Sequence, residues 1–372
     1  MRVVCITDSN ELEALKGDWN RLAEESPFRS WEWLSCWYSC LGQETRLQVL
    51  VVCDESSRIV GIAPFCLDSS LKRGRVMRFL GSGKACSDYM GLMVEPQHTY
   101  KVAAAVAAWL TNAASGTYGK QHVWELLELE GVTKEDDSIR ILDEALANES
   151  DWTQTLNSWR VTLPDSWDDY LSGLTKRARR KLRQLDKKFI ATGRAEWRLA
   201  SNETEMYEFY ESLVRLHTLR RDTIDGDGCF LYSGFEQFLR MSMEKLFEAD
   251  RLWLSELQID GRIAANAFGI KTKSGVSLYQ CGFDPDLGEY SPGWIQNIFN
   301  LKLAIASGHS HFDFLRGDEP YKKRLNGDPT EIYRVRLAAP HVLSKIRHKL
   351  WNAAGTAARI LPLGKSETAP EL

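Results

Sequence analysis

The sequence lacks the cysteine pattern of a zinc site or of a disulfide-stapled domain. Its 372 residues include eight cysteines, but none forms a C-x-x-C pair, and only Cys36 and Cys40 share a helix-like spacing. Structural zinc sites and small disulfide scaffolds both need closely spaced cysteine pairs. We therefore expect buried thiols in a reducing compartment, a cytoplasmic protein and no bound metal.

Long apolar segments and a targeting sequence are also missing. The longest apolar run, VAAAVAAWL at 102–110, is too short to span a bilayer, which takes about 20 residues. The N-terminal MRVVCITDSNELEAL predicts a strand and then a charged helix, with no signal-peptide core. The net charge of −4 gives the whole protein no attraction to nucleic acid or anionic membrane, so any polyanion site must be local.

What the sequence does contain is one order of elements that occurs twice. The first half predicts a strand, a helix at 10–24, a hairpin at 47–68, further strands, and an Ala-rich helix near 99–115. The second half repeats the hairpin at 251–272 with an Asp-Gly turn, followed by a strand, a Gly/Pro loop, a helix and the strand HFDFL. This pattern predicts two copies of one mixed α/β domain.

We expect three segments along the chain. The first domain spans 1–155 and the second 156–340, each a mixed, mostly antiparallel sheet flanked by helices. Residues 341–372 predict a basic, weakly amphipathic helix followed by a disordered tail. A strongly basic helix, 176–188, lies near the start of the second domain and can be capped by Thr175. Its apolar residues Ala178, Leu182 and Leu185, with Phe189 after them, fall on one stripe.

Charged side chains gather directly after the strand HFDFL, in HFDFLRGDEPYKKRL at 311–325. Strand alternation places Asp313 on the face opposite Phe312 and Phe314, where a carboxylate would accept a proton from an amine or bind its cation. Arg316 is suited to a bidentate contact with a carboxylate or phosphate. The alternative interpretation is a salt-bridged turn that fixes the C-terminal segment.

Three further side chains have chemistry suited to a site. Tyr279, in LYQCG, would serve as a general acid or as a donor to a carbonyl, although a strand tyrosine often only packs. His217 has a pKa range suited to a base, and its helix neighbours put it at an apolar–basic boundary, where a structural histidine is the alternative. Arg220 would bind a phosphate or carboxylate, or form part of a solvated surface.

The order hairpin, strand, Gly/Pro loop, helix and strand resembles the core of the GNAT superfamily of N-acetyltransferases. One stretch specifically resembles the BioF2-like or CelD-like branch of that superfamily: LYQCGFDPDLGEYSPGWIQNIFNLKLAIASGHSHFDFLRGDEPYKKRL. Its members look like tandem-domain relatives of the FemAB aminoacyltransferases that build peptidoglycan cross-bridges. The ending FDFLRGDEPYK is the most specific piece, and RARRKLRQL and LHTLRRDT support it.

The resemblance implies an acyl-transfer site in which two strands separate to admit the donor. In acetyl-CoA users of the superfamily, backbone amides of the loop after the fourth strand bind the pyrophosphate. That loop is GEYSPGW here, so Gly288, Gly293 and Trp294 are the expected cofactor-binding residues. The fuller glycine-rich pattern is missing, and Glu289 adds a negative charge. The corresponding loop of the first half, VEPQHTY, has no glycine, which implies a degenerate donor site there.

Together these features predict an N-acyltransferase. We expect transfer from acetyl-CoA or another acyl-CoA to an amine of an amino sugar, polysaccharide or cell-envelope precursor, so the acceptor is a small molecule or a glycan. The expected catalytic residues are Asp313, Tyr279, His217 and Tyr321, and the expected substrate-binding residues are Arg316, Asp318, Lys322 and Arg220.

Two alternatives remain open at this stage. A FemAB-like enzyme would take its acyl group from aminoacyl-tRNA, with the basic helix 176–188 holding the RNA, since clustered Lys and Arg neutralise phosphates. The same helix also suits another anionic surface, or is a plain solvated helix. A catalytically silent GNAT-fold protein would instead bind a component of exopolysaccharide or envelope assembly.

Overall fold

The chain divides into two compact units. The computed structural model describes residues 1–23, 25–70, 72–146, 150–222 and 228–360. The first unit holds Met1–Leu156 together with the segment from Glu331 onward, and the second holds Asn157–Thr330. The first predicted boundary, after residue 155, lies next to the observed division.

The second observed division, after Thr330, differs from the predicted boundary at 340. The segment between them belongs to β13 (Asp328–Ala338), which pairs antiparallel with β6 (Leu126–Val132). A strand that follows the second unit in sequence thus completes the sheet of the first. The helix expected in the C-terminal segment is α12 (Val342–Ile360), and the predicted disordered tail lies outside the described residues.

The first unit has a six-strand sheet in the order β1-β2-β3-β4-β6-β13, in which only the β4–β6 pair is parallel. The predicted hairpin at 47–68 is confirmed as the antiparallel pair β2–β3. Its remaining elements are β1 (Arg2–Ile6), α1 (Ser9–Glu13), α2 (Lys16–Ala23), α3 (Trp31–Leu41), β2 (Arg46–Cys53), β3 (Ile59–Ser70), β4 (Gly74–Phe79), η1 (Gly83–Ala85), β5 (Met93–Val94), η2 (Pro96–His98), α4 (Thr99–Ala114), η3 (Lys120–His122) and α5 (Asp137–Ala145).

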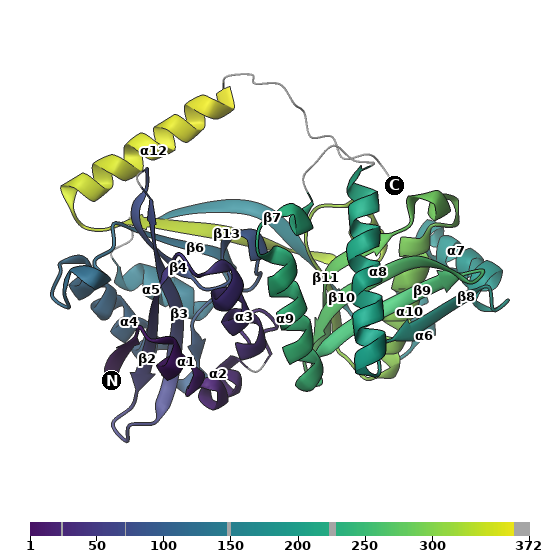
Figure 1. The fold of residues 1–372 in the computed structure, drawn as a ribbon, viewed down its shortest axis with the longest axis horizontal. Helices are drawn as coiled ribbons and strands as arrows, with labels where there is room; N and C mark the ends of the chain where they lie inside the picture. The colour runs from purple at the N-terminus through teal and green to yellow at the C-terminus, as the bar shows by residue number, and fades with distance from the viewer. Residues whose placement is uncertain (24, 71, 147–149, 223–227, 361–372) are drawn as a thin grey trace. The chain divides into compact units, whose positions relative to one another are not determined.

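The second unit has the sheet order β7-β12-β11-β10-β9-β8, and again one pair, β11–β12, is parallel. Helices α8 and α9 pack on one face of this sheet, while α10 packs on the other and contacts α7 (Figure 1). The elements are β7 (Asp151–Thr162), α6 (Trp167–Gly173), α7 (Lys176–Leu185), η4 (Asp186–Ile190), β8 (Ala195–Leu199), α8 (Glu203–Asp222), η5 (Cys229–Leu231), α9 (Phe235–Glu248), β9 (Leu252–Ile259), β10 (Arg262–Lys271), β11 (Gly275–Phe283), η6 (Pro285–Tyr290), α10 (Pro292–Ala306), β12 (His311–Arg316) and α11 (Pro320–Arg324).

The two units share one plan, which confirms the predicted pair of mixed α/β domains. Each begins with a strand and helices, continues with three antiparallel strands, and reaches its parallel strand through a helix. Antiparallel neighbours follow from short turns, whereas the parallel strand needs a crossover long enough to contain α4 or α10. In both units the last strand of the sheet comes from a distant part of the sequence, β13 in the first and β7 in the second.

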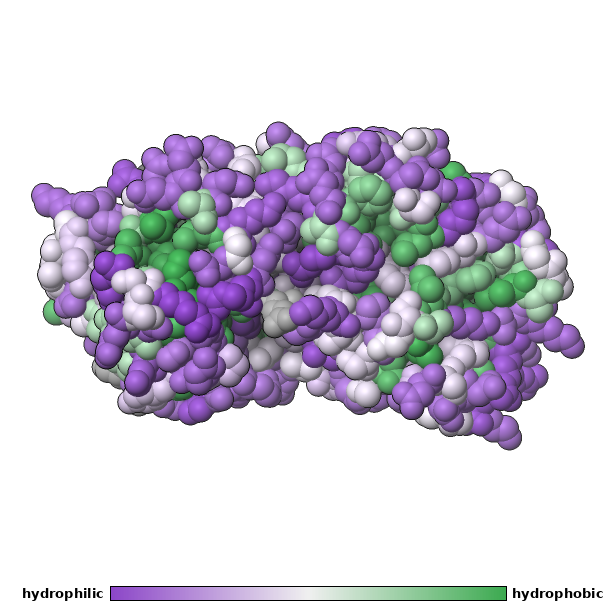
Figure 2. All heavy atoms as spheres, turned by 90° about the horizontal axis from the view of Figure 1, so that it is seen from below, coloured by the Kyte–Doolittle hydropathy of each residue, from purple (hydrophilic) through white to green (hydrophobic). Residues whose placement is uncertain are grey.

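Aromatic side chains fill the interior of the first unit. Trp31, Trp33 and Trp37 of α3 are buried, and the indole N–H of Trp33 donates to Ser87 Oγ at 2.9 Å. The indoles of Trp33 and Trp37 therefore contribute a large apolar area to the core while their N–H groups keep hydrogen-bond partners. Polar side chains cover most of the face drawn in Figure 2, and apolar ones gather there in a few patches.

Close packing of α8 on β11 depends on Gly282. A Cβ atom added at this residue would lie 2.7 Å from the backbone nitrogen of His217 and 2.9 Å from the Cβ atom of Leu216. Neither contact is tolerated without a backbone shift, so the glycine lets the helix approach the strand directly. This contact places His217 beside the second half of β11.

We expect Gly282→Ala to lower the free energy of unfolding by about 1–3 kcal/mol, because the added methyl group overpacks the α8–β11 contact. Urea denaturation measures the change. Gly173→Ala is the matched control, since a Cβ atom at Gly173 meets nothing within 4 Å. Equal stability of the two variants would contradict the close approach.

Candidate functional site

The strands β11 and β12 run side by side over only a short distance. Their described pairs are Gly275–His311, Val276–Phe312 and Ser277–Asp313. Beyond Ser277, β11 continues to Phe283 and pairs with β10. The parallel pairing therefore ends within the sheet at Ser277 and Asp313, and we call the interval between the unpaired parts of β11 and β12 the opening.

A β-bulge lies on the β11 side of this opening. Phe268 of β10 pairs with Gln280, and the next residue, Gly269, pairs with Leu278, so Tyr279 is the additional residue in β11. A bulge of this kind bends the strand and increases its local twist. The Tyr279 ring makes an edge contact with Phe268, with ring centroids 6.3 Å apart. Tyr279 thus lies in the part of β11 that borders the opening.

The β12 side of the opening is shaped by Asp313, whose carboxylate is buried. Asp313 Oδ1 accepts the backbone N–H of Leu315 at 2.8 Å and the hydroxyl of Ser158 at 3.3 Å, and Oδ2 accepts Arg160 Nε at 3.0 Å. The register between β12 and β7 shifts between Asp313 and Arg316, and Leu315 has a left-handed φ of 55°. Asp313 therefore stabilises the bend by which β12 leaves β11.

Lys322 of α11 holds the same bend from its other side. Its buried ammonium donates to the carbonyl oxygens of Leu315 at 3.1 Å and Arg316 at 2.9 Å, and pairs with Glu319 at 2.9 Å. The backbone of Leu315 is thus held by two side chains of opposite charge. Asp313 accepts its N–H, and Lys322 donates to its carbonyl oxygen. The geometry gives Lys322 a structural role next to the site, where the sequence predicted a substrate contact.

Asp318 and Arg316 lie in the connection between β12 and α11. Asp318 is exposed and accepts the side-chain amide of Asn157 at 2.8 Å and the indole N–H of Trp159 at 3.1 Å. The Arg316 backbone is held by Lys322, and its side chain is half-buried. The salt-bridged turn that the sequence left open as an alternative is therefore present, and it borders the opening.

Lys322→Met should lower the free energy of unfolding by about 2–4 kcal/mol, because the buried carbonyl of Leu315 and the partly buried carbonyl of Arg316 lose their donor. Chemical denaturation checks this value. Lys323→Met provides the control on the same helix, since Lys323 is exposed. A loss below about 0.5 kcal/mol, the size expected of a surface substitution, would show that Lys322 does not hold the bend.

Tyr321 projects from α11, the first helix after the opening. Its ring packs edge-on against Phe314 of β12, with centroids 5.7 Å apart, and the residue is partly buried. The phenol is therefore carried by a ring whose orientation is set by packing. Of the predicted catalytic residues, Tyr279, Asp313 and Tyr321 all belong to the segments that border the opening.

His217 lies on α8 rather than on a strand, buried beside Gly282 of β11. Its Nε2 is 3.7 Å from the sulfur of Cys229, and its ring makes an edge contact with Phe230 at 5.0 Å. These contacts are those of a packed histidine close to the second half of β11. Arg220 is three residues further along α8, and its side chain lies outside the described part of the structure.

The N-terminus of α10 provides a place for an anion. Ser291, with a φ of 56°, precedes the helix, and its carbonyl accepts the amides of Trp294 and Ile295. A Cβ atom at Gly288 or Gly293 meets nothing within 4 Å, so a ligand can approach the backbone at both glycines. The exposed Glu289 in the same loop opposes an anion.

Basic side chains of α7 lie next to this helix N-terminus. The predicted helix is confirmed: Thr175 Oγ1 accepts the Ala178 amide at 3.3 Å. Lys181 Nζ lies 4.2 Å from the centre of the Trp294 ring. Burial lowers the pKa of Lys181, and the neighbouring charges of Arg324 and Arg177 lower it further. Positive charge is thus concentrated beside Trp294, which favours a bound anion.

Sequence reasoning missed the residues that support this site from elsewhere. Ser158 and Arg160 come from β7, more than 150 positions before Asp313, and no local pattern links the two segments. Lys181 was assigned only to a basic helix, without its contact to Trp294. The single available signal was the apolar stripe of that helix, which predicted its buried face correctly at Ala178 and Leu182.

In the first unit the equivalent place is occupied by the chain itself. The β4–β6 pairs also number three, Val76–Leu126 to Arg78–Glu128. Beyond them, Met90 N–H donates to the carbonyl of Gly131 at 2.8 Å. A Cβ atom at Gly131 would lie 2.1 Å from the carbonyl oxygen of Ser87. The loop after β4 therefore packs directly against β6.

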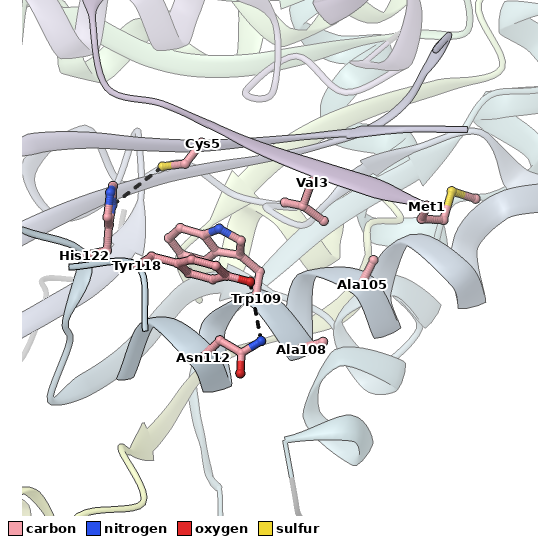
Figure 3. A pocket seen from close by; sticks show the side chains of 9 residues that line it. All are labelled: Met1, Val3, Cys5, Ala105, Ala108, Trp109, Asn112, Tyr118 and His122. Atoms are coloured by element: carbon pink, nitrogen blue, oxygen red, sulfur yellow. Dashed lines mark hydrogen bonds between the residues drawn. The ribbon is translucent and has the colours of Figure 1, made fainter. Parts of the chain in front are cut away.

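A separate hollow of about 440 Å³ lies in the first unit between β1 and α4 (Figure 3). Trp109 and Tyr118 stack in it at 5.5 Å, and His122 Nδ1 lies 2.7 Å from Gln48 Oε1. Burial raises the pKa of the Cys5 thiol to about 12 and lowers that of His122. Both groups are therefore neutral near pH 7, so the contact between Cys5 Sγ and His122 Nδ1, at 3.9 Å, is not an activated nucleophile.

Most of the second unit matches a family model. Residues 176–323 match the family model described as "Acetyltransferase (GNAT) domain". The chain has a GNAT fold. This match covers the opening, α7 and the α10 N-terminus. No curated protein matches the chain significantly.

Several solved structures are similar over most of the chain. FemX has a TM-score of 0.62 at 11% identity, covering 90% of this chain and 97% of that one. L-PGS from Bacillus licheniformis has a TM-score of 0.52 at 12% identity, with coverages of 88% and 98%. A tandem GNAT protein from the clavulanic acid biosynthesis pathway has a TM-score of 0.50 at 13% identity, with coverages of 91% and 99%.

At such low sequence identity, these structural similarities establish the fold alone. They confirm the predicted resemblance to tandem GNAT and FemAB-like proteins, while the BioF2-like or CelD-like branch stays a prediction. Within the described ranges, no helix is both long and apolar enough to cross a membrane. No group of three or more His, Cys, Asp or Glu side chains among the described residues is placed to bind a metal ion.

Proposed function

We propose that the second unit is an N-acyltransferase whose acyl donor enters the opening between β11 and β12. The observation that carries this proposal is the early separation of the two parallel strands, held by Asp313 and Lys322, inside a segment that matches a GNAT domain. Strand carboxyl ends are the usual ligand site of α/β sheets. The packed loop of the first unit supports our view that its donor site is degenerate.

An acyl-CoA is the donor that best fits the residues present. When bound, it would supply an activated carbonyl group. Gly288 and Gly293 leave the backbone before α10 accessible, and the helix N-terminus together with Lys181 would hold the pyrophosphate. A bound anion would also relieve the repulsion among Lys181, Arg177 and Arg324.

The residues around the opening suggest a division of roles. The amine forms a C–N bond with the acyl carbon and gives up a proton, while the C–S bond breaks and the sulfur takes up a proton. We propose that the Tyr321 phenol donates the proton that the sulfur takes up. Asp313 would position β12, because its oxygens already accept three hydrogen bonds. Tyr279 lies on the β11 bulge, where it would orient the carbonyl. An amino sugar, polysaccharide or envelope precursor is the acceptor class that we propose.

The basic face of α7 favours one alternative donor. The exposed side chains of Lys176, Arg177 and Lys187 extend along α7 and η4, and such clusters bind nucleic acid phosphates. The fold is similar to that of FemX, whose name places it with the FemAB-like proteins. For that class, aminoacyl-tRNA is the expected donor. The alternative is therefore an aminoacyl transfer from tRNA at the same opening.

Thermal shift distinguishes these donors. We expect acetyl-CoA or a longer acyl-CoA to raise the melting temperature by roughly 5–10 °C at 100 times its dissociation constant, because only the native state binds it. Lys181→Gln should abolish most of this shift. It should change the unliganded stability by less than about 1 kcal/mol, because relief of repulsion opposes the lost contact with Trp294. Lys187→Gln is the matched control on the same basic segment.

The other outcomes point elsewhere. A shift with uncharged tRNA alone, weakened by both lysine variants, would favour the aminoacyl-tRNA donor. No shift with acyl-CoA, free CoA or tRNA would overturn the enzyme proposal and favour a GNAT-fold binding protein.

Tyr321→Phe tests the chemical step in a separate assay. Chromatography of the products of acyl-CoA and a panel of amines should show kcat reduced by about 10²–10⁴-fold, the range for loss of a general acid. The thermal shift with the donor should be unchanged, because the ring and its contact with Phe314 remain. An unaltered kcat would remove Tyr321 from the mechanism.

A further inference from the structure

The start of α12 is docked on the first unit through one face only. Ser344 is buried, and Arg347 forms an ion pair with Glu125. One turn later the guanidinium of Arg336 lies over the Trp351 ring, 4.3 Å from its centre. The i, i+3 and i+7 spacing of Ser344, Arg347 and Trp351 puts all three on one side of the helix.

The opposite side of α12 exposes an apolar stripe. The exposed fractions are 74% for Val342, 79% for Leu343, 49% for Ile346 and 67% for Leu350. At 100° per residue these four side chains fall within one third of the helix circumference. Elsewhere in the described residues, exposed large apolar side chains occur singly or in pairs along the sequence. A continuous exposed stripe of this kind marks an interaction surface.

Lysine residues border one side of the stripe. Lys345 and Lys349 follow that edge at the helical spacing, whereas Arg347, at the other edge, is ion-paired with Glu125. Residues 342–351 contain no Asp or Glu, although the whole chain has a net charge of −4. The helix is therefore a local cationic, amphipathic element on an otherwise slightly acidic protein.

We propose that α12 binds the surface of an anionic membrane. The stripe of Val342, Leu343, Ile346 and Leu350 would enter the boundary between headgroups and acyl chains, and the exposed Lys349 would contact lipid phosphates. Helices with an apolar stripe bordered by lysine lie in bilayer interfaces in this way, and anionic lipids strengthen the binding.

The proposal is independent of acyl transfer, because it concerns a surface of the first unit. Its consequence is that the protein would be concentrated on the bilayer without a membrane-spanning segment. Neither the single apolar stripe nor the lysines alone would suffice, since both contributions are needed for stable binding of a short interfacial helix.

Co-sedimentation of the full chain with vesicles tests the proposal. We expect binding to vesicles of phosphatidylcholine with 30% phosphatidylglycerol, weaker binding at high salt, and little binding to phosphatidylcholine alone. Ile346→Glu with Leu350→Glu should weaken binding at least about tenfold, because two apolar side chains no longer enter the interface. Lys349→Gln should weaken it about fivefold at low salt. Tyr100→Glu, which alters a 71% exposed residue on α4, is the matched control and should bind normally.

Two results would overturn the proposal. The first is absence of binding to anionic vesicles, or binding that the Ile346/Leu350 variant leaves unchanged. The second is a lower melting temperature or a changed oligomeric state of that variant in the absence of lipid, which would show that the stripe is covered by the protein itself or by a second copy.

Discussion

The candidate site depends on how the backbone of Leu315 is held. A left-handed conformation costs a non-glycine residue roughly 1–2 kcal/mol, and Leu315 adopts it within a buried strand. Two charge-assisted hydrogen bonds offset that cost, from its N–H to Asp313 and to its C=O from Lys322. With both backbone groups satisfied inside the protein, β12 can bend away from β11 and leave the sheet open at its centre.

The acidic and basic cluster after β12 therefore has a structural role, and it borders the candidate site. Asp313, Lys322 and Asp318 all have hydrogen-bond or ion-pair partners within the second unit, so the protein itself compensates each of these charges. Their contacts nevertheless shape the opening and present Tyr321 beside it. Charges that bind each other can still be indispensable to a site, because they determine the position of the backbone that borders it.

The two units share an arrangement of strands but differ in the segment that follows the parallel pair. Both contain a parallel pair that holds for three residue pairs and then stops. In the first unit the following loop fills the space with its own backbone, through contacts of Ser87 and Met90 to Gly131. In the second, the following segment forms a helix N-terminus with accessible glycines and a neighbouring lysine, Lys181. The difference lies in the loops, while the strands are alike.

Periodicity in the sequence was sufficient for the hairpins, the repeated plan, the helix 176–188 with its buried stripe, and the strands that carry Tyr279 and Asp313. Those features depend on residues close in sequence, where alternation or helical spacing carries the information. Tertiary structure alone decided that Arg160 meets Asp313, that β13 closes the first sheet, that Lys322 is buried, and that the apolar stripe of α12 faces outward. Each of these depends on which distant segments pack together, and a side chain's burial is a property of that packing and not of its own neighbours along the chain.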